Sequence, residues 1–156
     1  MNGKQNLDFV AATAAHQICE VIGTKLNNKK EVGATDVENL VTKALSVLQA
    51  QGIYAMALFL LSRSGKKTNE KEMSAEERVA VQILACLWSL CNPQSVSIEN
   101  GKITLNKEPR QINTVKKDML NEFRDLTQDM DTLLLVREIY EQTLIYARYG
   151  AKAEGK

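Results

Sequence analysis

The stretch that decides the fold is Leu48-Gln-Ala-Gln-Gly-Ile-Tyr-Ala-Met-Ala-Leu-Phe-Leu-Leu-Ser-Arg-Ser-Gly-Lys-Lys67. A helix ends near Gly52, and nine uninterrupted apolar residues follow from Ile53 to Leu61. A helix that is apolar all round must be covered on every side, so this run predicts the centre of a helical core. It is too short to cross a bilayer, which requires about 20 residues. The run ends in three cations that we expect at the surface: Arg63, Lys66 and Lys67.

Composition supports a helical reading of the whole chain. A length of 156 residues fits a single domain, residues 1–156, without disulfides or metal. Two prolines, eight glycines and 5% aromatic residues favour long helices over a β-sandwich or barrel. The formal charge of +1 does not predict a nucleic-acid partner, so any such binding depends on how the charges are distributed. The N-terminal residues lack the apolar core of a signal peptide, so we expect a cytoplasmic protein with no membrane contact.

Apolar periodicity predicts helices on both sides of the opening stretch. Residues 7–26 carry helically spaced apolar side chains, and Thr35-Asp-Val-Glu38 reads as a capping box for a second helix. Ser74-Ala-Glu-Glu77 is a second capping box, whose helix stops at Asn92-Pro93. Further helices are predicted over 112–128 and 131–153. The expected buried stripes are Phe9, Val10, Ala14, Ile18, Val21 and Ile22; Val37, Leu40, Val41, Ala44, Leu45 and Leu48; Val79, Ile83, Leu84, Leu87, Trp88 and Leu90; and Leu133, Val136, Tyr140, Thr143, Leu144, Ala147 and Ala151.

Two segments depart from this pattern. Residues 65–73 are polar without periodicity and predict a surface loop. Residues 96–105 alternate in polarity around Asn100-Gly101, which is typical of a β-hairpin. The predicted fold is therefore an all-α bundle of five or six helices, with one small inserted hairpin lying against them.

Residues able to do catalytic chemistry are few. The single histidine, His16, and Cys19 are one helical turn apart, as two metal ligands can be. Cys86 and Cys91 are five residues apart and diverge on a helix, so they do not complete a tetrahedral zinc site. Buried thiols in a reducing compartment are the favoured interpretation. We expect no enzymatic activity, no metal and no cofactor.

Four carboxylates follow a helical spacing near the C-terminal third of the chain: Asp118, Glu122, Asp125 and Asp129. A solvated face is the first interpretation of this stripe. A contact with a protein partner is the second, and a shelf for a divalent cation is the third.

Basic residues are also organised along the last predicted helix. Arg137, Arg148 and Lys152 fall nearly on one line, and Glu141 is positioned to pair with Arg137. If such cations converge with those after the apolar run, they form a groove that tracks phosphates; otherwise they are simply solvated. Tyr146 and Tyr149 lie beside this line and are interpreted as packing residues.

Two segments carry a resemblance to a known family: Gln51-Gly-Ile-Tyr-Ala-Met-Ala-Leu-Phe-Leu-Leu-Ser-Arg63 and Glu138-Ile-Tyr-Glu-Gln-Thr-Leu-Ile-Tyr-Ala-Arg-Tyr-Gly-Ala-Lys152. A glycine, a short apolar helix and a basic exit, followed later by an aromatic and basic terminal helix, resemble the small helical subunit of type III CRISPR effector complexes, in particular the Cmr-type small subunit.

The resemblance implies a non-catalytic subunit with defined partners. Several copies stack head to tail beside the backbone and large subunits. Basic residues contact the backbone of the target RNA and of the guide–target duplex without reading sequence. Carried onto this chain, the contacts are Arg63, Lys66, Lys67, Arg137, Arg148 and Lys152. We add the inference that the acidic stripe 118–129 meets a basic patch of the next copy. The alternatives are a helical protein adaptor with no nucleic-acid role and, last, a small metal-dependent enzyme.

Overall fold

The computed structural model describes residues 7–26, 30–65, 72–91, 96–99, 102–105 and 116–155, with backbone only for 89, 91, 96–99, 102–105 and 116–119. Its elements are α1 (Leu7–Cys19), α2 (Ala34–Gln51), α3 (Ile53–Ser64), α4 (Ala75–Cys91), β1 (Val96–Glu99), β2 (Lys102–Leu105), α5 (Lys116–Asp125), the 3-10 turn η5 (Leu126–Gln128) and α6 (Met130–Glu154). The prediction of an all-α bundle is confirmed.

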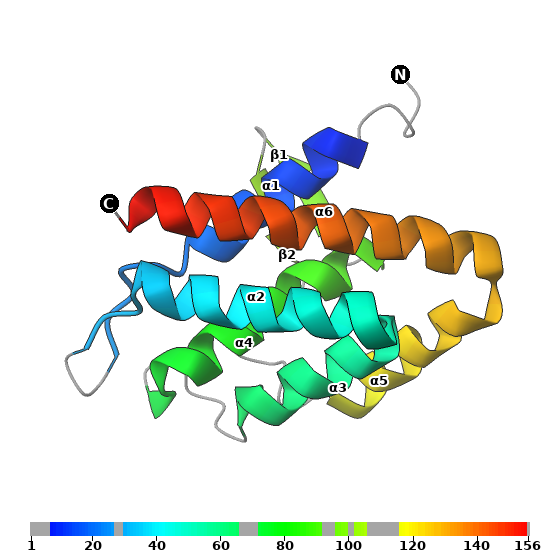
Figure 1. The fold of residues 1–156 in the computed structure, drawn as a ribbon, viewed down its shortest axis with the longest axis horizontal. Coiled ribbons are helices and arrows are strands. Elements are labelled where there is room, and N and C mark those ends of the chain that lie inside the picture. Colours follow the sequence, from blue (N-terminus) through cyan, green and yellow to red (C-terminus); the bar gives the residue numbers. More distant parts are fainter. Residues whose placement is uncertain are drawn as a thin grey trace.

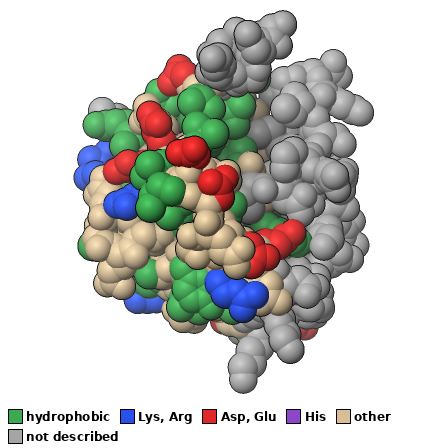
Figure 2. Space-filling model, turned by 90° about the vertical axis from the view of Figure 1, so that its right-hand side faces the viewer, with side chains coloured by type: hydrophobic (Ala, Val, Ile, Leu, Met, Phe, Trp, Pro, Cys, Tyr) green, Lys and Arg blue, Asp and Glu red, His purple; other side chains and the backbone are tan. Residues whose placement is uncertain are grey.

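The helices are arranged around α6 and α2. α6 packs against α1 on one side and against α2 on the other, and α2 separates α6 from α3 (Figure 1). α4 lies behind this layer and contacts α1, α2 and α3. The chain turns from α5 through η5 into α6 at the end of the molecule that faces the viewer in Figure 2. Among the described helices, none has the length and apolarity needed to span a bilayer.

The helix covered on every side is α4. Every side chain from Arg78 to Val81 and from Ile83 to Trp88 is buried. The run Val79–Cys91 is interrupted only by Gln82 and Ser89, and Gln82 is satisfied because its Nε2 donates to the Gln17 carbonyl at 2.8 Å. α4 is therefore the centre of the core.

The prediction that residues 53–61 are covered all round is wrong. α3 buries Ile53, Met56, Ala57, Leu60 and Leu61, but Tyr54 and Leu58 remain 36% and 44% exposed. These two side chains are one turn apart and lie on the face of α3 that no other described element covers. The apolar run is thus an amphipathic surface helix, one side of which packs on α4.

The first helix is shorter than its apolar spacing predicts. α1 ends at Cys19, and the chain turns at Gly23, whose φ of +89° favours glycine. The Gly23 N–H donates to the Val32 carbonyl at 2.7 Å, and Lys25 and Glu31 form an isolated β-bridge. Val21 stays in the core from this turn, whereas Phe9, expected to be buried, is 49% exposed.

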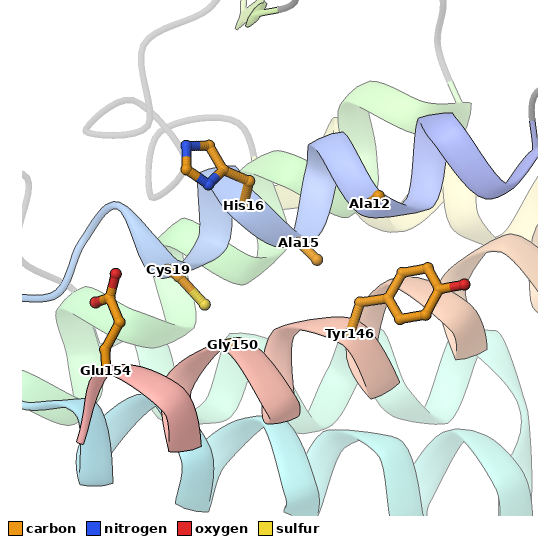
Figure 3. Close-up of a pocket in the computed structure, with 7 residues that line it drawn as sticks. All are labelled: Ala12, Ala15, His16, Cys19, Tyr146, Gly150 and Glu154. Carbon is orange, nitrogen blue, oxygen red and sulfur yellow. The ribbon is translucent and has the colours of Figure 1, made fainter. Parts of the chain in front are cut away.

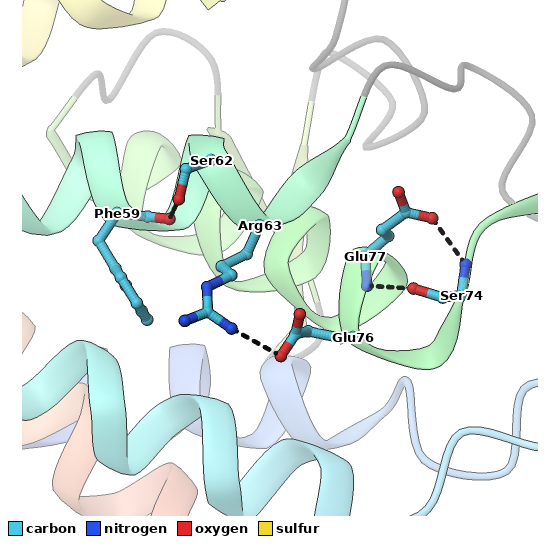
Figure 4. A network of polar contacts seen from close by, with 6 residues as sticks. All are labelled: Phe59, Ser62, Arg63, Ser74, Glu76 and Glu77. Atoms are coloured by element: carbon cyan, nitrogen blue, oxygen red, sulfur yellow. Dashed lines mark hydrogen bonds and ion pairs between the residues drawn. The ribbon is translucent and has the colours of Figure 1, made fainter.

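One predicted capping box is confirmed and one is wrong. At α4, the Ser74 N–H donates to Glu77 Oε1 at 2.8 Å and the Glu77 N–H donates to Ser74 Oγ at 3.1 Å (Figure 4). At α2 the cap is Gly33 rather than Thr35, because the helix begins at Ala34. The Asp36 carboxylate accepts the Gly33 N–H at 2.9 Å, so the acid of this cap is Asp36 and not Glu38.

The predicted stripes of α2 and α6 are confirmed. All six expected residues of α2 are buried, and in α6 only Leu133 is partly exposed. Tyr140, fully buried in α6, donates its hydroxyl to the Leu87 carbonyl of α4 at 2.6 Å and packs edge-on against Phe123 of α5. As expected, α2 ends just before Gly52, whose φ is +99°, and α4 ends at Cys91.

β1 and β2 pair antiparallel, with Val96 opposite Leu105 and Glu99 opposite Lys102. β2 contacts α1 and α4. The predicted Asn100-Gly101 turn and residues 66–71 of the predicted loop lie outside the described residues, as do residues 112–115 of the helix predicted over 112–128.

Candidate nucleic-acid interface

Three of the predicted basic residues lie along one flank of α6, on the side that faces α2. Arg137 and Lys152 both contact α2 residues, and Arg148 falls between them on the same side of the helix. At 1.5 Å per residue, the line from Arg137 to Lys152 spans roughly 22 Å along the helix axis. The structure therefore brings these three cations together as an elongated strip, which we call the α6 basic flank.

Arg137 is held at the C-terminal end of α2. Its Nη2 donates to the Gln49 carbonyl at 3.0 Å, while Gln49 Nε2 donates to Glu141 Oε2 at 2.9 Å. The predicted pairing of Glu141 with Arg137 is therefore wrong, because Gln49 engages both groups. A helix C-terminus carries partial negative charge, so the Arg137 guanidinium is well placed there.

The other two cations of the flank are less constrained. Lys152 Nζ lies 3.8 Å from Glu38 Oε2, and both side chains are partly exposed, so this ion pair contributes at most about 1 kcal/mol. Arg148 is half-buried, and its Nε has no hydrogen-bond acceptor within the described part of the chain. The Lys152 side chain is therefore available for an external anion with little loss of internal bonding, whereas Arg148 Nε is buried.

Arg63 lies apart from the flank, because α2 separates α3 from α6 (Figure 1). Its Nη1 is 3.1 Å from Glu76 Oε2 of α4, and its guanidinium stacks 5.0 Å from the centre of the Phe59 ring (Figure 4). Arg63 thus already has an anionic and an aromatic partner. Lys66 and Lys67 lie outside the described residues.

The four predicted interface carboxylates do not form one continuous face. α5 ends at Asp125, and η5 intervenes before Asp129. Glu122 accepts a hydrogen bond from Trp88 Nε1, Asp125 lies 3.7 Å from Arg124 Nη2, and Asp129 accepts from the Thr132 hydroxyl. The side chain of Asp118 is not described. Asp129 therefore falls outside the predicted stripe, because η5 interrupts the helix, whereas Glu122 and Asp125 lie within α5 at the predicted spacing.

His16 and Cys19 line a shallow pocket between α1 and α6 (Figure 3). The pocket has a volume of about 230 Å³ and is lined by Ala12, Ala15, His16, Cys19, Tyr146, Gly150 and Glu154. Helices α1 and α6 approach closely here, since a Cβ built on Gly150 would lie 3.1 Å from Cys19 Sγ. The Cys19 thiol donates to the Ala147 carbonyl at 3.5 Å.

The thiols of Cys19 and Cys86 are poor nucleophiles at neutral pH. Burial, assisted by Glu154, raises the pKa of Cys19 to about 11. Burial raises the pKa of Cys86 to about 12, with a further increase from Glu20. A hydrogen bond to Asp8 raises the pKa of Tyr146. Within the described residues, no group of three or more His, Cys, Asp or Glu side chains is arranged to hold a metal ion.

Sequence reasoning missed two groups of residues. Arg78 was not singled out, yet it is buried near the start of α4, where its Nη1 donates to Gln82 Oε1 at 3.0 Å. The exposed apolar side chains at the start of α6 were also missed. The signal for the latter is the run Leu133-Leu134-Leu135, because three consecutive helical residues cannot all face one core.

Comparison of the chain with protein-family models, with curated proteins and with solved structures finds no match.

Proposed function

We propose that this chain is a cytoplasmic, non-catalytic small subunit of a type III CRISPR RNA-guided effector complex. In this role several copies stack beside the backbone and large subunits, and basic residues hold the backbone of the target RNA and guide–target duplex. The proposal rests on the family resemblance of residues 51–63 and 138–152, which correspond to α3 with its preceding corner and to the second half of α6.

The observation that carries the nucleic-acid part is the α6 basic flank. A line of cations that extends for roughly 22 Å along a helix suits an extended polyanion better than a small compact ligand. The Lys152–Glu38 pair is weak enough for a phosphate to replace the carboxylate. Arg63, on the far side of α2, is a second and separate contact in this proposal.

The proposal predicts weak, salt-dependent and sequence-independent binding of single-stranded RNA. A labelled RNA of about 30 nucleotides, titrated by fluorescence polarisation over a salt series, measures the slope of log K against log salt. Replacing the flank with Arg137→Gln/Arg148→Gln/Lys152→Gln should make the slope shallower by about two units, since each lost phosphate contact contributes roughly 0.7.

A matched control removes three exposed cations from other elements: Lys25→Gln/Lys43→Gln/Arg124→Gln. It changes net charge equally and should leave the slope nearly unaltered. An equal loss in both triple variants, or no binding by the wild type at low salt, contradicts the assignment of the flank. Arg63→Gln, measured alone, tests the separate contact.

The alternative function is a helical adaptor for protein partners. A specific observation favours it: large apolar side chains are exposed at the start of α6.

A further inference from the structure

The first two turns of α6 extend beyond the helices that pack against the rest of it. Arg137 of α6 contacts Gln49 of α2, and Lys152 contacts Glu38, so the two helices run antiparallel. α2 ends at Gln51, two residues after Gln49, and the chain turns away at Gly52. The residues of α6 that precede Arg137 therefore lie past the end of α2.

This projecting segment is apolar on its open side. Met130, Leu134 and Leu135 are 64%, 55% and 45% exposed. Leu133 and Val136 face the core instead, so the helix already has its buried side. Met130 and Leu134 are one turn apart, and Leu135 lies about 100° from Leu134 around the helix, so the three side chains share the exposed half of α6. We call these three side chains the α6 apolar patch.

Carboxylates bracket the patch. Asp131 lies one turn before Leu134 and Leu135, Glu138 lies one turn after them, and both acids are exposed. Asp129, exposed as well, begins the helix. Figure 2 shows this end of the molecule, where Asp and Glu side chains gather among hydrophobic ones while Lys and Arg lie mainly to the left and below. The cation one turn after Leu134 is Arg137, whose guanidinium donates to the Gln49 carbonyl of α2.

The charges decide which class of occupant fits. Phosphate backbones and anionic lipid surfaces are repelled by the bracketing carboxylates. If two copies met symmetrically through this patch, Asp131 and Glu138 of one copy would lie near the same carboxylates of the other and repel them. A partner with apolar side chains surrounded by Lys or Arg would cover the leucines and also form ion pairs with the carboxylates.

We propose that the α6 apolar patch docks a basic amphipathic helix of another polypeptide. Its apolar side chains cover Met130, Leu134 and Leu135, and its cations pair with Asp131 and Glu138. Recognition is the packing of the apolar face of one helix against that of another, with charge setting the choice of partner. The site is distinct from the α6 basic flank, so it stands independently of the RNA-binding proposal.

Three designed peptides of about 18 residues, long enough to be helical, serve as probes. The first carries a leucine stripe with lysines on the polar face. The second keeps the stripe and replaces the lysines with glutamates, and the third keeps the lysines and replaces the leucines with serines. Fluorescence anisotropy of each labelled peptide, titrated with the full chain at about 50 mM and about 300 mM salt, measures Kd and its salt dependence.

The leucine–lysine peptide should bind at least about tenfold more tightly than either of the other two, a difference of about 1.4 kcal/mol. Leu134→Gln/Leu135→Gln should weaken binding about tenfold or more at both salt concentrations. Asp131→Asn/Glu138→Gln should weaken it mainly at low salt. The matched control is Leu58→Gln on α3, which alters another exposed leucine and should leave Kd unchanged.

Three results would overturn the proposal. The first is similar affinity for all three peptides, and the second is equal weakening by Leu58→Gln and by the double leucine variant. The third is self-association of the wild type, seen by light scattering after size exclusion, that Leu134→Gln/Leu135→Gln abolishes, because a second copy would then be the occupant. Circular dichroism spectra of the variants check that the fold is retained.

Discussion

At the scale of single residues, the thiols illustrate how burial sets chemistry. Cys19 lies against α6 and Cys86 lies within the central helix, and burial is the main cause of the raised pKa of both. A thiolate at either position would be separated from water, so the neutral form is favoured in the folded state. These residues behave as small apolar side chains that fill the core.

The raised values predict how stability depends on pH. The folded-state pKa values of about 11 and about 12 exceed the reference value of 9.0, so unfolding releases protons above pH 9.0. The stabilising contribution of these thiols is complete below pH 9.0 and is lost as pH rises towards 11. Urea denaturation at a series of pH values should show the free energy of unfolding falling above pH 9.0.

The variant Cys19→Ala/Cys86→Ala isolates the thiols from the lysines and tyrosines that titrate in the same range. Its stability should decline less steeply than that of the wild type across this alkaline window. Parallel declines in the two proteins would show that the thiols do not contribute.

At the scale of elements, the start of α2 depends on one acid that the sequence pattern misassigned. A Thr-x-x-Glu pattern at 35–38 suggested the cap, but Gly33 precedes the helix and Asp36 accepts its N–H. Local hydrogen bonding favours either register. The register found here places the cap, Gly33, directly after Val32, which is buried in the core.

This assignment predicts different effects for two adjacent substitutions. Asp36→Ala should reduce the free energy of unfolding by about 1 kcal/mol, because it removes the cap and a favourable charge from the first turn. Thr35→Ala should change it by less than about 0.5 kcal/mol, since Thr35 is exposed. Urea denaturation of both variants provides the measurement. A larger loss of unfolding free energy in Thr35→Ala than in Asp36→Ala would show that Thr35 caps the helix, as the Thr-x-x-Glu pattern predicts.

At the scale of the whole molecule, the arrangement of helices determines which apolar run becomes the core. α4 contacts α1, α2 and α3, whereas α3 lies at the surface with Tyr54 and Leu58 exposed. A fully covered helix needs neighbours on every side, and only the central position supplies them.

Leucine truncation in the two helices tests this difference. Leu84→Ala in α4 should reduce the free energy of unfolding by about 2–5 kcal/mol, because it leaves a cavity in the core. Leu58→Ala in α3 should cost less than about 1 kcal/mol, since the side chain is 44% exposed. Both changes are Leu to Ala within a helix, so helix propensity is matched, and equal losses would refute the central position of α4.

The sequence by itself determined the helical class, the buried stripes of α2 and α6, the end of α4 and its Ser74–Glu77 cap. Each of these depends on residues within one or two turns of each other, where periodicity and capping act directly. The sequence also placed Arg137, Arg148 and Lys152 on one line of a helix, because three turns return nearly to the same direction.

Only the tertiary structure decided the features that depend on neighbours distant in the chain. It set α4 rather than α3 at the centre and separated Arg63 from the α6 basic flank. It also placed Gln49 where it forms hydrogen bonds with both Arg137 and Glu141. It also left Leu134 and Leu135 beyond the end of α2. Periodicity identifies an apolar face, but whether that face is covered depends on where the partner helix ends.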